Sequence, residues 1–89
     1  MAQFVLVRHK VRNFTEWKKG FDAHKPKRAE AKLIDRHVLQ SADDPNNVYV
    51  LFEAEDMDRA KKFADSEDLK QTMQKAGVVD RPDIQFLKS

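Results

Sequence analysis

The sequence predicts an α+β sandwich of the ferredoxin-like class, with one four-stranded antiparallel sheet and two helices on one face. Two observations predict it. Strand-like and helix-like patterns alternate in the order β-α-β-β-α-β, and the 89 residues suffice for one domain, 1–89. Because crossover connections are right-handed, the first and third strands should lie in the centre of the sheet and the second and fourth at its edges.

The first third of the chain predicts a strand followed by a helix. Gln3–Val11 is rich in β-branched residues and too short for a helix. Asn13 then offers an N-cap, with Glu16 three residues later as in a capping box. An apolar stripe at helical spacing follows on this helix: Phe14, Trp17, Phe21 and His24. Pro26 should end the helix at or just before Lys25.

The middle of the chain predicts a β-hairpin. The polar segment Lys27–Lys32 fits either a loop or a fraying helical turn. Leu33–Gln40 and Asn47–Glu55 both have strand composition, and the second of them is the most strand-like segment of the chain. Ser41–Asn46 lies between them and concentrates the Asp, Pro and Asn residues that favour tight turns.

The last third predicts a helical region followed by a closing strand. Asp56 or Asp58 should cap the helix. Its apolar stripe is interrupted at Asp65–Asp68, where Ser66 can cap a fresh turn, so a kink or two short helices are expected. Asp83–Lys88 then forms the fourth strand.

The strands have apolar residues on both faces, which predicts that both sheet faces are covered. In the second strand, alternation puts Ile34 and Val38 on one face and Leu33 and Leu39 on the other. Two helices can cover only one face of a four-stranded sheet, and an exposed apolar face invites aggregation. A second copy of the chain is the simplest cover, so we expect a homodimer whose sheets face each other.

Several segments together resemble a known superfamily: VRHKV, NFTEW, DDPNNVYVLFEAED and KKFADSEDLKQTMQKAGVVDRPDIQFL. They are similar to the dimeric α/β-barrel superfamily, and most of all to its small domains like the antibiotic-biosynthesis monooxygenases. The resemblance implies dimerisation through the sheet into an α/β barrel, with a ligand pocket between helices and sheet or between the sheets. Members include cofactor-free monooxygenases, polyketide cyclases, lactone isomerases and haem-degrading enzymes.

The resemblance implies a homodimeric protein that binds a small apolar or aromatic, polyketide-like molecule and needs no cofactor. Two functions are compatible with this resemblance. The protein could be an enzyme with monooxygenase or cyclase chemistry, or a non-catalytic module for ligand sensing or protein association. Haem degradation fits less well, because haem-binding members carry an axial histidine on the second helix and Asp58–Lys75 has none.

His9 is the candidate catalytic residue. It lies in line with Val5 and Val7 on a central strand, so its imidazole shares a largely apolar face. In a cleft it could act as a general base or orient a phenol or carbonyl oxygen. The alternative is a structural histidine at the dimer interface, and the alternation does not say which face it addresses.

The candidate ligand-binding residues are Trp17, Tyr49, Arg8 and His37. Trp17 fits the core or an aromatic wall of a pocket, and Tyr49 and Arg8 supply polar groups. His37 lies on an edge strand, two strands and roughly 10 Å from His9, so the two histidines cannot share a metal. A surface position suits it better, and no metal site is predicted.

Composition and charge argue against other partners. The 17 basic and 15 acidic residues nearly cancel, and Asn47–Ala54 lacks the third-strand motif of RNA-recognition domains, so no nucleic acid is expected. The longest apolar run, Phe4–Val7, is far too short to span a membrane. With no cysteine and no signal-peptide pattern, a cytoplasmic domain is expected. One basic stretch is typical of a solvated connection between secondary-structure elements: Lys25, Lys27, Arg28 and Lys32.

Overall fold

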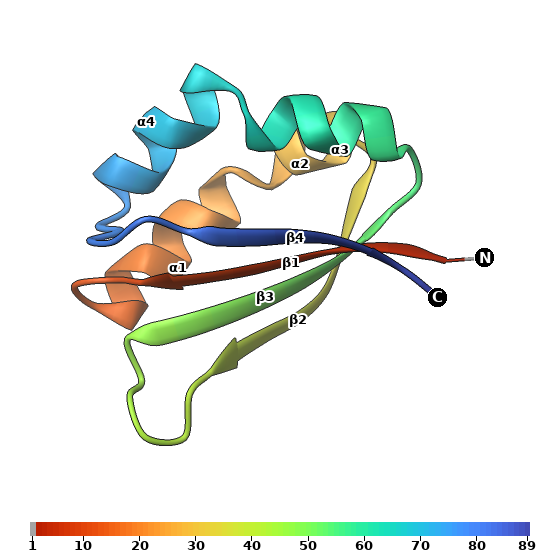
Figure 1. Ribbon diagram of the computed structural model, residues 1–89. Coiled ribbons are helices and arrows are strands. Elements are labelled where there is room, and N and C mark those ends of the chain that lie inside the picture. Colours follow the sequence, from red (N-terminus) through yellow and green to blue (C-terminus); the bar gives the residue numbers. More distant parts are fainter. Residues whose placement is uncertain (1) are drawn as a thin grey trace.

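The computed structural model describes residues 2–89 as a sheet covered by helices on one face (Figure 1). The elements are β1 Gln3–Lys10, α1 Phe14–Ala23, α2 Lys25–Glu30, β2 Leu33–Gln40, β3 Asn47–Ala54, α3 Met57–Ala64, α4 Glu67–Lys75 and β4 Asp83–Lys88. The sheet is antiparallel with strand order β2-β3-β1-β4. The predicted fold class and the central position of the first and third strands are therefore confirmed.

The helices begin and end where short-range chemistry places them. The Asn13 side chain accepts a hydrogen bond from the Glu16 N–H at 3.1 Å and so caps α1. This helix ends at Ala23, but the chain continues as α2, so the ambiguous segment after Pro26 is helical as far as Glu30. Proline is tolerated there because an N–H in the first turn needs no intrahelical partner.

The second helical region is divided in two, as the interrupted stripe predicted. Asp56 caps α3 by accepting from the Arg59 N–H at 3.2 Å. Ser66 caps α4 by accepting from the Leu69 N–H, also at 3.2 Å. Gly77 ends the region with a φ of 92°, a left-handed conformation that a side chain would strain.

A β-bulge at Arg36 changes which β2 side chains face the helices, so the faces predicted for β2 are wrong in part. The register between β2 and β3 shifts there, so one extra residue enters the strand. The prediction that Ile34 and Val38 share a face is wrong, because strict alternation fails across the bulge. Leu33 and Val38 lie on the helix-facing side, and Ile34 lies on the opposite side with Leu39.

Both faces of the sheet carry apolar side chains. The helix-facing side forms the buried core, with Val48 and Val50 at its centre. The other side, which we call the open face, carries a second apolar set: Phe4, Leu6, Ile34, Leu39, Tyr49, Leu51 and Leu87. Leu39 is 55% exposed and Leu87 41% exposed in the single chain.

Within residues 2–89 there is no helix of the length and apolarity that crossing a membrane requires.

Candidate functional site

A cavity lies between the helical layer and the sheet. Its volume is about 70 Å³, and one water needs on the order of 10–15 Å³, so it holds several non-hydrogen atoms. Aromatic and aliphatic side chains make up most of its wall: Val5, Val7, Trp17, Phe21, Phe52 and Phe63. Such a wall suits an apolar or planar molecule.

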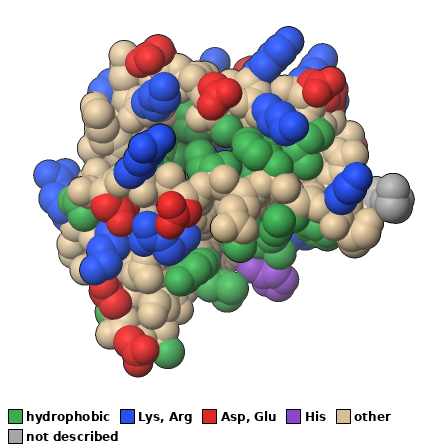
Figure 2. Space-filling model, viewed as in Figure 1, with side chains coloured by type: hydrophobic (Ala, Val, Ile, Leu, Met, Phe, Trp, Pro, Cys, Tyr) green, Lys and Arg blue, Asp and Glu red, His purple; other side chains and the backbone are tan. Residues whose placement is uncertain are grey.

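The mouth of the cavity lies between α4 and β4. A second hollow of about 640 Å³ adjoins it there, and the two share part of their lining: Ala64, Leu69, Met73 and Ile84. Figure 2 shows hydrophobic side chains at the bottom of this hollow, with charged side chains around its rim. The hollow therefore lies on the side from which a ligand would approach the cavity.

His9 is a buried polar group of the cavity wall that has no partner. It is only 3% exposed, and neither ring nitrogen has a hydrogen-bond partner within residues 2–89. Its ring stands edge-on to Trp17, with centroids 5.4 Å apart and planes at 67°. A buried polar group without a partner costs about 1–3 kcal/mol, so an unpaired imidazole at a cavity wall points to a ligand or water.

Burial keeps His9 uncharged. Desolvation lowers the pKa of His9 to about 4, aided by the positive charge of Arg8 and opposed by Asp80. At neutral pH its ring therefore has one N–H donor and one acceptor nitrogen. His9 can orient an oxygen atom of a ligand without adding a charge to the cavity.

His24 and Thr72 line the same cavity and were not among the residues predicted for the site. His24 stacks on Phe63 at 5.8 Å, and its Nε2 lies 3.3 Å from a carboxylate oxygen of Asp68. His24 is visible in the sequence as the last member of the apolar stripe. Thr72 gives no such signal, because it is a polar residue on a mostly polar helix.

Arg28 lines another part of the cavity wall, and its burial contradicts the prediction that its basic stretch is solvated. Its position in a basic stretch predicts solvation, but the side chain is only 4% exposed. It donates two 3.0 Å hydrogen bonds to the carboxylate of Asp35 and one to the Phe21 carbonyl, and its guanidinium lies 3.7 Å from the Phe21 ring centroid. The Asp35 carboxylate offsets its charge, so Arg28 is not a free cation for an anionic ligand.

The residues predicted for the site are divided between the two faces of the sheet. His9 and Trp17 meet at the cavity. Arg8, Tyr49 and His37 belong to the open face, where His37 is exposed. One sheet layer separates the two groups, so they cannot contact one small ligand within a single chain.

Arg8 is engaged in a network at one end of the open face. It donates to Asp83 at 2.9 Å, to the Asn47 side chain at 3.0 Å and to Asp80 at 3.3 Å. Asp80 also accepts from the Lys10 N–H at 2.8 Å. This network attaches the segment before β4 to β1 and so supports one wall of the cavity mouth.

Within residues 2–89, no three His, Cys, Asp or Glu side chains are grouped so that they could hold a metal ion.

Comparison with known proteins identifies the fold. No family model and no curated protein matches the sequence. Among solved structures, a conserved protein from Methanosarcina mazei Go1 aligns at 16% identity and a TM-score of 0.74, over 99% of this chain and 92% of that chain. A candidate antibiotic biosynthesis monooxygenase from Caulobacter crescentus CB15 aligns at 19% identity and 0.72, over 99% and 89%.

A third neighbour has an activity in its name. SnoaB, a cofactor-independent oxygenase from Streptomyces nogalater, aligns at 12% identity and a TM-score of 0.70, over 99% of this chain and 94% of that chain. This chain has the fold of these proteins. The resemblance to antibiotic-biosynthesis monooxygenase domains, which the sequence alone suggested, is thus confirmed in the fold. At these identities the likeness concerns the fold and not the activity.

Proposed function

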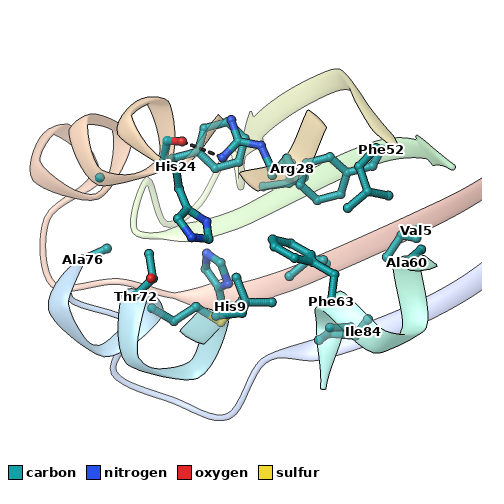
Figure 3. Close-up of a pocket in the computed structure, with 18 of the residues that line it drawn as sticks. Val5, His9, His24, Arg28, Phe52, Ala60, Phe63, Thr72, Ala76 and Ile84 are labelled. Atoms are coloured by element: carbon teal, nitrogen blue, oxygen red, sulfur yellow. Dashed lines mark hydrogen bonds between the residues drawn. The ribbon is translucent and has the colours of Figure 1, made fainter. Parts of the chain in front are cut away.

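We propose that this protein binds a small, uncharged aromatic or apolar molecule in the cavity between helices and sheet, with His9 as its polar contact. The observation that carries the proposal is the unpaired imidazole of His9, buried at the wall of an otherwise mostly apolar cavity (Figure 3). A ligand oxygen at His9 would satisfy a ring nitrogen that the protein leaves without a partner. The aromatic wall would hold the rest of the molecule.

The activity we propose is cofactor-independent oxygenation of a phenolic substrate. In such a reaction, O₂ converts a phenol to a quinone: one oxygen atom enters the ring, the other leaves as water, and the substrate supplies the electrons. His9 would accept a hydrogen bond from the phenolic O–H and hold the ring against Trp17. The cofactor-independent oxygenase among the proteins of the same fold supports this reaction class.

Oxygen consumption tests the activity. Single-ring phenols with an unsubstituted para position should support oxygen uptake by the wild-type protein, and His9→Ala, which removes the group that positions the phenolic O–H, should lower the rate by about 100-fold. Thr15→Val, on an exposed position of α1, is the control and should keep the wild-type rate. A His9→Ala variant as active as the wild type would remove His9 from the mechanism.

A non-catalytic ligand sensor is the second candidate, and one observation favours it. A histidine with a pKa of about 4 is a weak base at neutral pH, so His9 suits hydrogen bonding better than proton abstraction. In that case the same phenols would bind to the wild-type protein with no oxygen uptake. Binding measured beside oxygen uptake separates the two functions.

The proposal includes a homodimer formed through the open face. Seven apolar residues lie on that face without cover from the helices. A second copy of the chain would bury them and would also bring the open-face residues Tyr49 and His37 into the interface.

A further inference from the structure

Three of the four polar side chains that line the cavity, those of His9, His24 and Thr72, lie at one end of it, and the fourth, Arg28, is held by Asp35. In Figure 3 the imidazoles of His9 and His24 point toward one another, and Thr72 lies on the same side of the view. Phe52, Ala60 and other apolar residues lie toward the opposite end of the view. The three polar residues come from three separate elements, β1, the end of α1 and α4, and all of them line the cavity.

From this arrangement we infer that His24 and Thr72 form, with His9, a hydroxyl-binding subsite that selects an uncharged ligand with an O–H group and orients it. The inference rests on the proposed binding function and adds two specificity-determining residues to it. The O–H of the ligand lies among these three side chains, and its apolar body extends toward Phe52 and Phe63.

The hydrogen-bonding capacity of the three residues matches a hydroxyl group. Neutral His9 provides a donor and an acceptor, and both are unpaired within residues 2–89. In its uncharged form, His24 can donate its Nε2–H to Asp68 and then has Nδ1 as an acceptor. The Thr72 hydroxyl can donate or accept. A ligand hydroxyl, which also does both, can therefore donate to an imidazole and accept from Thr72 or His9.

A charged ligand fits this subsite poorly. Arg28 is the buried cation of the cavity wall, and Asp35 already accepts two of its hydrogen bonds. A carboxylate would lose its hydration without gaining a free positive charge, which is costly in an apolar cavity. A hydrocarbon would leave His9 unpaired, so an uncharged hydroxyl compound is the best match.

Two probes of similar size test the subsite by ¹⁹F NMR titration: 4-fluorophenol and 4-fluorotoluene. A wholly apolar cavity would bind the toluene more tightly, because the phenol gives up hydrogen bonds to water. We expect the wild-type protein to bind the phenol at least as tightly. Thr72→Val and His24→Phe should each weaken phenol binding about ten-fold and change toluene binding by less than about two-fold. Thr15→Val is the control and should match the wild type.

The outcomes separate this inference from the function on which it rests. If the wild-type protein binds the toluene and not the phenol, or if Thr72→Val and His24→Phe leave the ratio of the two dissociation constants unchanged, the subsite is wrong and the binding cavity stands. If both variants weaken both probes equally, their role is structural and the subsite is also wrong. If neither probe binds the wild-type protein, the proposed binding function is overturned, and the subsite with it.

Discussion

The imidazole of His9 is buried without a hydrogen-bond partner, which costs free energy of folding. Its strand neighbours alternate so that Val5, Val7 and His9 all face the helices, where the core is apolar. Trp17 packs on the ring by its edge and offers it no acceptor. A hydrocarbon side chain here would remove the cost of an unpaired imidazole. Its presence is best explained by a ligand that pairs with it.

The stability of the protein should depend on pH through His9. Its pKa is about 4 in the folded chain and 6.5 is the ordinary value, so between these pH values the unfolded chain binds a proton that the folded chain does not. Stability therefore falls as the pH drops through this window, by about 3 kcal/mol at pH 4. Urea unfolding of the wild type and of His9→Phe, each at pH 7.5 and at pH 4, measures how much of this loss of stability comes from His9.

The comparison with the variant isolates His9 from other titrating groups. The wild-type free energy of unfolding should drop by about 3 kcal/mol more than that of His9→Phe between the two pH values. Equal drops in both proteins would show that His9 is not held uncharged in the folded state.

At the residue scale the sequence predicted part of the site. Alternation placed His9 beside Val5 and Val7, and the stripe on the first helix placed Trp17 toward the sheet. The face that His9 addresses needed the structure, because both faces of β1 carry apolar residues. The burial of Arg28 was missed, since its partner Asp35 lies on the next strand and no local spacing connects them.

At the scale of elements, short-range signals predicted most boundaries. Caps at Asn13 and Ser66 set the starts of α1 and α4, and the turn residues 41–46 set the hairpin. One feature was left open and one was predicted wrongly, each for a physical reason. The proline in the first turn of α2 is compatible with a helix start as well as a helix end, and the bulge at Arg36 depends on pairing with β3, which alternation in one strand cannot reveal.

The cavity wall formed by α4 differs from the wall formed by α1. α1 buries Trp17 in the core, whereas α4 has no buried residue and starts at the Ser66 cap. The helix that carries Thr72 thus lies over the mouth of the cavity and is the least embedded part of the helical layer. This is the arrangement in which a ligand can enter without disturbing the sheet.

At the scale of the whole molecule, the open face predicts self-association. Sedimentation at about 10 μM should give about 21 kDa, twice the 10.4 kDa of one chain. Leu51→Lys, which places a charge among the apolar residues of the open face, should shift the protein to the monomer mass. Val79→Lys, at a 56% exposed position in the α4–β4 hollow, should leave the dimer intact. A wild-type mass near 10.4 kDa would contradict the dimer.

The central claim is that a small uncharged molecule binds beside His9, and imidazole ¹⁵N NMR tests it most directly. The chain has three histidines, and His37, on the open face and one sheet layer away from the cavity, serves as an internal reference. On titration with 4-fluorophenol, the ring nitrogens of His9 should shift with saturation while those of His37 stay unchanged. Unchanged His9 resonances at saturating probe, or a shift confined to His37, would contradict the claim.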